Sequence, residues 1–189
     1  MVPVMRTIGM LVAVSVAAGL ALSGCGSTSA PDQGGAGDIP DNQAFVEYRP
    51  PGDRYSIKVP EGWSRAESGG STTFTDKLNT ITVNLGTRAA APEAATGQAD
   101  LTTLRGTLAG FTPGKVSEVQ RTAGPVLLVT YRADAAPDPV TGKVVNDDVE
   151  RYSYWHAPGD LLTVMLAGPH GADNVDPWRT VTDSVRWLP

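Results

Sequence analysis

Apolar and polar residues alternate in short runs from residue 45 onward, which is the pattern of β-strands. Alternation places every second side chain on one face, so each run can bury that face in a core. The run Val126–Arg132 has few polar interruptions and is expected to be a central strand, buried on both faces. In all, we predict strands at Phe45–Tyr48, Tyr55–Val59, Thr72–Thr75, Thr80–Leu85, Lys115–Thr122, Val126–Arg132, Val149–His156 and Leu161–Ala167.

Two stretches have helical spacing instead. Between Gln98 and Ala109, leucines recur at positions 101, 104 and 108, and Gly110 is a natural stop. Near the C-terminus, Asp176 is expected to cap a helix whose first residue is Pro177. The apolar stripe of this second helix consists of Trp178, Val181 and Val185. Each stripe is one-sided, so each helix should cover a sheet.

Most connections between the predicted strands are short turns, of which Ala157–Asp160 is the clearest. Residues 76–79 join another pair, whereas Arg65–Gly70 is predicted to be a loop. Short turns join antiparallel neighbours. We therefore predict an α+β fold for residues 45–189, in which a mostly antiparallel sheet is layered with two helices that cover one or both of its faces.

The N-terminal segment has a different character. Arg6 precedes an apolar run from Ile8 to Leu22, about 15 residues long, whereas about 20 are needed to cross a bilayer. Such a segment is typical of a secretory signal. It ends in Leu22-Ser23-Gly24-Cys25, which includes the only cysteine of the chain.

These four residues resemble the lipobox of bacterial lipoprotein precursors at every position. The resemblance implies that residues 1–24 are a signal peptide, cleaved before Cys25, and that the Cys25 sulfur carries a diacylglyceryl group. Two or three acyl chains on one residue anchor a protein stably at a membrane. The alternative is a signal-anchor helix with an incidental cysteine. On the lipoprotein interpretation, residues 25–44 are the lipidated cysteine and a flexible tether on the extracytoplasmic face of the cell membrane.

The charge balance limits the possible partners. The formal net charge of −5 becomes −6 without residues 1–24, because Arg6 is their only charged residue. An acidic chain lacks the basic face that nucleic acid requires, so nucleic acid is not an expected partner. A lipidated Cys25 leaves no thiol for a disulfide, a cysteine nucleophile or a thiolate metal site. The composition also resembles that of actinobacterial proteins.

Few residues suggest catalysis. The chain has no Gly-x-Ser-x-Gly motif, and His156 and His170 are interpreted as a strand-end residue and a loop residue, with acid–base or metal-binding roles as lesser alternatives. The nearest carboxylates in sequence are Asp160 and Asp173. Acidic clusters near residues 147–150 and 173–176 lack the spacing of a calcium loop. We therefore predict no catalytic residue, no metal and no cofactor.

The aromatic run of Tyr152, Tyr154 and Trp155 is the strongest candidate binding surface. In a strand, Tyr152 and Tyr154 share one face and Trp155 lies on the other. An exposed row of these rings would suit a protein, a sugar or a lipid. The alternative is that they pack in the core.

The strand-turn-strand at the start of the folded part, which ends in Pro60-Glu61-Gly62-Trp63, and the helix after a long meander resemble the Mog1/PsbP-like fold. The resemblance implies a scaffold that binds partners and supplies no catalytic residues. We therefore predict a non-catalytic binding module on the cell envelope, whose partner is an envelope protein or a cell-wall component. The alternative is a carrier that holds a lipid or another apolar ligand in a cavity between sheet and helices.

Overall fold

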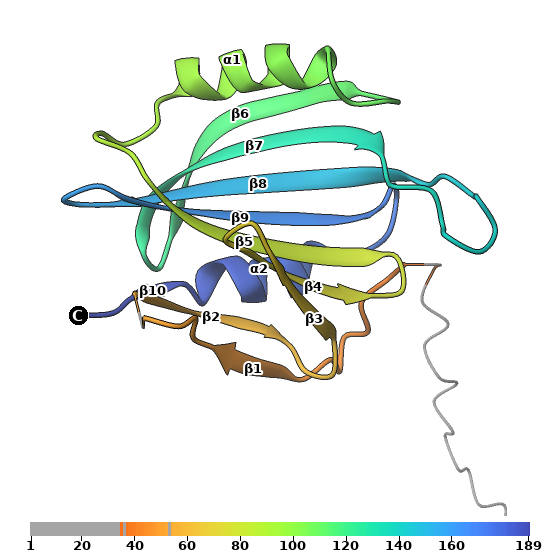
Figure 1. The fold of residues 1–189 in the computed structure, drawn as a ribbon, viewed down its shortest axis with the longest axis horizontal. Coiled ribbons are helices and arrows are strands. Elements are labelled where there is room, and N and C mark those ends of the chain that lie inside the picture. Colours follow the sequence, from red (N-terminus) through yellow and green to blue (C-terminus); the bar gives the residue numbers. More distant parts are fainter. Residues whose placement is uncertain (1–34, 36, 53) are drawn as a thin grey trace, which may run out of the picture. The chain divides into compact units, whose positions relative to one another are not determined.

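The computed structural model describes residues 35, 37–52 and 54–189 of the chain (Figure 1). The predicted signal peptide and the lipobox with Cys25 lie outside the described residues. No helix within the described ranges is both long enough and apolar enough to cross a membrane.

A seven-stranded sheet forms the centre of the fold, and all its neighbouring strands are antiparallel. The hairpins predicted around residues 76–79 and 157–160 are both present. In spatial order the strands are β3 (Ser64–Ser68), β4 (Ser71–Asp76), β5 (Asn79–Thr87), β9 (Asp160–Pro169), β8 (Asn146–His156), β7 (Gly124–Asp134) and β6 (Thr112–Arg121).

A smaller antiparallel sheet and two helices pack on this central sheet (Figure 1). The small sheet has the order β1 (Phe45–Tyr48), β2 (Tyr55–Pro60), β10 (Arg186–Trp187). The helices are α1 (Ala94–Arg105) and α2 (Val175–Asp183). The predicted α+β fold with a mostly antiparallel sheet and two helices is therefore confirmed.

The two helices cover opposite faces of the large sheet, because its side chains alternate between two apolar clusters. On one face, Leu162 and Leu166 of β9 pack with Ile57 of β2 and Val181 of α2. On the other face, residues of β7 and β8 pack against Leu101 of α1. We call these the α2-side core and the α1-side core.

Strand β3 was not predicted, since residues 65–70 were expected to form a loop. Every residue of β3 is exposed, so the strand carries no apolar alternation that could reveal it. It is held by pairing with β4 through a turn at Gly69 and Gly70, both of which have positive φ. Strand β7 is also less central than predicted, because it lies between β8 and the edge strand β6.

The helices begin earlier than expected. Helix α1 starts at Ala94 and ends before Gly106, whereas the leucine spacing predicted residues 98–109. Gly97 faces the sheet so closely that a Cβ would lie 2.6 Å from the Val116 Cγ1 atom. In α2, Asn174 rather than Asp176 occupies the capping position, and the predicted stripe of Trp178, Val181 and Val185 is buried as expected.

Part of the predicted tether is packed against the folded domain. Ile39 is only 4% exposed, and its N–H donates to Asn174 Oδ1 at 2.8 Å. The Gly37 carbonyl accepts from Asn79 Nδ2 at 2.7 Å and from Asn174 Nδ2 at 3.2 Å. The prediction of a flexible tether through residue 44 is therefore wrong for residues 37–39, because one apolar side chain and a buried asparagine pair hold them.

Candidate functional site

The candidate site is a groove on the α2 side of the large sheet, at the N-terminal end of that helix. Strands β7 and β8 pair so that Thr130 lies opposite Glu150 and Arg132 lies opposite Asp148. Opposite residues in an antiparallel pair project to the same face. One step further along, Leu128 and Tyr152 belong to the α2-side core, so the face changes from apolar to charged where α2 no longer covers it.

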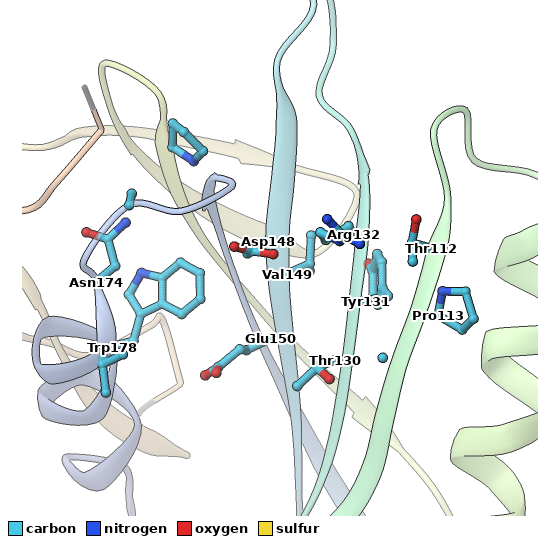
Figure 2. A pocket seen from close by; sticks show the side chains of 14 residues that line it. Thr112, Pro113, Thr130, Tyr131, Arg132, Asp148, Val149, Glu150, Asn174 and Trp178 are labelled. Carbon is cyan, nitrogen blue, oxygen red and sulfur yellow. The ribbon is translucent and has the colours of Figure 1, made fainter. Parts of the chain in front are cut away.

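This hollow, which we call the α2 groove, has a volume of about 320 Å³. Figure 2 shows Trp178 and Asn174 on one side, Thr112 and Pro113 on the other, and the polar side chains of β7 and β8 between them. The groove opens to solvent at exposed Val175 and Thr112. Three charged side chains line it: Arg132, Asp148 and Glu150.

His170 links two of these charged residues at the rim. Its Nδ1 lies 2.8 Å from Asp148 Oδ2, and its Nε2 lies 3.1 Å from an Arg132 guanidinium nitrogen. Because a guanidinium only donates, Nε2 must accept from Arg132 and Nδ1–H must donate to Asp148. The Gly171 N–H donates a second bond to Asp148 at 3.2 Å. The imidazole therefore bridges a cation and a carboxylate.

A second network fixes the groove at Glu150. The Tyr152 hydroxyl donates to Glu150 Oε2 at 2.7 Å and accepts from Arg121 at 3.1 Å. The Arg121 guanidinium also lies 5.1 Å from the centre of the Tyr152 ring and donates to Thr182 Oγ1. Burial, followed by the bond to Glu150, raises the pKa of Tyr152 to about 12. The hydroxyl therefore stays a donor and orients the carboxylate.

These contacts suit binding better than proton transfer. A general base needs a free lone pair within reach of a nucleophile, but the Nε2 lone pair of His170 accepts from Arg132. Groups of three or more His, Cys, Asp or Glu side chains that could hold a metal ion are absent from the part of the chain that the structure describes. The groove presents a cation and two carboxylates on strands of a paired sheet, which is a rigid surface for polar recognition.

The aromatic candidates lie elsewhere. Tyr152 and Tyr154 are 2% and 1% exposed and belong to the α2-side core, so the prediction of an exposed row is wrong for both and the core alternative is confirmed. Trp155 lies on the other face, half-buried, and its Nε1–H donates to the Arg88 carbonyl at 2.9 Å. The three rings therefore do not form a common binding surface.

Neither histidine side chain forms an ion pair with the carboxylate nearest to it in sequence, although His156 lies opposite Asp160 in the β8–β9 register. His170 contacts Asp148, which is 22 positions away, while Asp160 forms an ion pair with Arg54. The exposed ring of His156 stacks on Trp187 with a centre-to-centre distance of 5.0 Å. Sequence spacing could not reveal the contact of His170 with Asp148, because the contact depends on how the chain turns after β9.

Asp147 is an unexpected buried acid. It was interpreted as part of a solvated strand entrance, but it is 9% exposed and its Oδ1 has no hydrogen-bond partner among the described residues. Burial and the neighbouring charge of Asp148 raise the pKa of Asp147 to about 6. The folded state therefore binds this proton more tightly than the unfolded chain does.

We expect Asp147→Asn to stabilise the protein at neutral pH. The raised pKa of Asp147 contributes favourably to the free energy of unfolding. This contribution is fully present below the ordinary carboxyl pKa of ~3.9, and it is lost as the pH rises through about 6. At neutral pH the variant should gain on the order of 1–3 kcal/mol in free energy of unfolding, and below about pH 4 almost nothing. Urea denaturation across this range measures both, with exposed Asp41→Asn as the control. An equal gain at both ends would contradict the argument.

No protein-family model and no curated protein matches the sequence. Solved structures do match the fold. Cyanobacterial PsbP (CyanoP) from Synechocystis has a TM-score of 0.56 and 15% identity over 82% of this chain and 99% of that chain. The Ran-binding protein Mog1p from Saccharomyces cerevisiae has a TM-score of 0.52 and 12% identity over 77% of this chain and 96% of that chain.

A protein from Bacteroides thetaiotaomicron is also similar, with a TM-score of 0.51 and 13% identity over 76% of this chain. The match covers 48% of the Bacteroides chain, so it spans about half of that protein's length. Sequence identities this low carry information about fold and not about activity. The folded part of this chain therefore has the Mog1/PsbP-like fold.

Proposed function

We propose that this protein is a lipid-anchored, extracytoplasmic binding module without catalytic activity, and that the α2 groove is its binding site. The observation that carries the proposal is the contrast between a closely packed core and an open charged groove. Fully buried side chains fill the α2-side core, including Ile57, Leu162 and Leu166. The polar groups of the groove are fixed by hydrogen bonds before any partner arrives, which lowers the cost of binding.

The same contrast supports a binding module over a carrier of apolar ligands. A carrier needs a large apolar cavity between sheet and helices, whereas the α2 groove is lined by Arg132, Asp148 and Glu150 and opens to solvent. Mog1p, which has this fold, is a Ran-binding protein. We expect the partner here to be an envelope protein or a cell-wall component.

Anchoring is tested by Cys25→Ser. Because the thioether can form only on sulfur, the variant should lose lipidation and remain uncleaved before residue 25, and it should be retained to a smaller extent in the membrane fraction. Mass spectrometry of the N-terminal peptide and fractionation of host cells measure these effects. The matched control is Ser27→Ala, which leaves residues 22–25 unchanged. Unchanged processing and membrane retention of Cys25→Ser would overturn this part of the proposal.

Binding at the groove is tested with a photo-crosslinking amino acid in living cells. Val175 lines the groove and is 67% exposed, while Val140 lies in the β7–β8 loop outside the groove lining and is 90% exposed, so the two valines form a matched pair. We expect a discrete crosslinked product at position 175 that is lost with Arg132→Glu. Equal products at both positions, or hydrolytic turnover that is abolished by changing His156 or His170, would contradict the proposal.

A further inference from the structure

The lining of the α2 groove includes a buried hydrogen-bond donor that no described residue uses. The Trp178 side chain is 7% exposed, yet its Nε1–H has no acceptor in the part of the chain that the structure describes. The neighbouring buried amide of Asn174 is satisfied, since it bonds the Gly37 carbonyl and Asn79 Oδ1. A buried polar group without a partner lowers stability, so this N–H calls for an acceptor from outside the chain.

Two main-chain donors lie at the same end of α2. The N–H groups of Val175 and Asp176, in the first turn, donate to no described residue, and the Asn174 side chain makes no capping bond. Side chains of a helix lean toward its N-terminus, which brings the Trp178 indole toward this turn. Figure 2 shows the indole nitrogen on the side of the ring that faces Asn174. This end of the groove therefore suits a hydrogen-bond acceptor such as a carbonyl oxygen.

The next group along the groove is the Glu150 carboxylate. It is half-buried and accepts from the Tyr152 hydroxyl, but it forms no ion pair with any described residue. Arg121, which bonds the same hydroxyl, pairs with Asp183 instead, at 3.6 Å. Figure 2 shows Glu150 reaching from β8 toward α2 and the Trp178 ring. A carboxylate beside an indole ring favours a cationic group, because both attract positive charge.

The remaining charges of the lining define the ligand further. Arg132, Asp148 and Glu150 give the groove one positive and two negative charges, so an anionic ligand is disfavoured. A neutral ligand would desolvate Glu150 without supplying a counter-charge, which is costly. Arg132 lies further toward β6 and has guanidinium donors besides the one that bonds His170, so a second acceptor fits there. Across the groove, the groups therefore call for an acceptor, a cation and another acceptor.

We propose that the α2 groove binds an extended segment of a partner protein through one basic side chain. The ammonium or guanidinium group pairs with Glu150, one main-chain carbonyl accepts from the Trp178 Nε1–H, and another accepts from Arg132. A peptide matches this order, because carbonyls lie on either side of each side chain. The inference rests on the proposed function, since it names the partner chemistry of the same groove. Nε1 has almost no exposed surface in the free protein, so the lining must shift slightly to admit the carbonyl.

The test titrates the purified full-length protein with the acetylated, amidated tripeptides Ala-Lys-Ala and Ala-Gln-Ala, which differ in one charge. Calorimetry measures affinity, and the NMR resonance of the Trp178 indole proton, assigned with Trp178→Phe, measures formation of its hydrogen bond. The lysine peptide should bind about tenfold more tightly and shift the indole resonance downfield. Glu150→Gln should remove this preference, because it loses the charge but keeps an acceptor for the Tyr152 hydroxyl.

The matched control is Glu118→Gln, at an exposed position of β6 outside the groove lining, which should leave both affinities unchanged. The proposal is overturned if the lysine peptide binds no more tightly than the glutamine peptide, if Glu150→Gln keeps the preference, or if the Trp178 indole resonance does not move at saturation. Crosslinking at Val175 separates this inference from the proposed function. A crosslinked product without peptide binding would overturn only the basic segment, whereas loss of that product would overturn the groove as a binding site.

Discussion

Asn174→Ala should destabilise the protein by about 2–4 kcal/mol and release residues 37–39 from the domain. The Asn174 side chain accepts from the Ile39 N–H and donates to the Gly37 carbonyl and to Asn79 Oδ1. Its removal leaves these buried groups without partners, which costs more than the net value of the lost bonds. Urea denaturation measures the loss of stability, and limited proteolysis within residues 37–42 measures the release.

Two variants make this result specific. Asn174→Asp keeps an acceptor for the Ile39 N–H but loses both donors, so it should fall between the parent protein and the alanine variant. Asn42→Ala changes an exposed asparagine of the same segment and should change stability by less than about 0.5 kcal/mol. A loss below about 1 kcal/mol for Asn174→Ala, or unchanged proteolysis, would show that the segment is held by other contacts.

Leu162→Ala should cost about 2–5 kcal/mol, the second large effect. Leu162 is fully buried at the centre of the α2-side core, on the strand that joins the β3–β5 half of the sheet to the β6–β8 half. Truncation removes apolar contacts and leaves a cavity that the paired strands on both sides prevent from closing. Denaturation in urea, followed by tryptophan fluorescence, measures the free energy of unfolding.

The control for this core variant is Leu78→Ala. Leu78 lies in the turn between β4 and β5 and is 42% exposed, so the same truncation should change stability by less than about 0.5 kcal/mol. A similarly small change in the free energy of unfolding for Leu162→Ala would mean that the core tolerates a cavity there. That result would favour the carrier hypothesis, in which a ligand fills space between sheet and helices.

The alternation of apolar and polar residues predicted those strands whose two faces lie in different surroundings. β5, β8 and β9 have such faces, and all three were found close to their expected bounds. Strand β3 was not predicted, because all its residues are exposed and only its pairing with β4 makes it a strand. Helix α1 was misplaced because its first turn contains Gly97, a poor helix former that the sequence pattern penalises but close packing on the sheet requires.

The candidate site was not predictable from spacing. Arg132, Asp148 and His170 come from three separate elements and meet only because β7 pairs with β8 in one register. Docking of the segment before β1 does leave a signal in the sequence. Ile39 is a single apolar residue in a polar stretch, which indicates a docking point on the domain rather than free chain.

The docking of Gly37 on the domain also bears on the distance between the folded domain and a membrane that holds Cys25. If Cys25 carries the acyl chains, only the eleven residues 26–36 separate the anchor from the docked segment, and such a length spans at most about 40 Å. Gly37 lies against Pro169, and Asp38 accepts from the Asp173 N–H, both beside the rim of the α2 groove. With Cys25 as the anchor, we would expect the opening of the α2 groove to stay within that distance of the headgroups, in reach of partners embedded in the same bilayer.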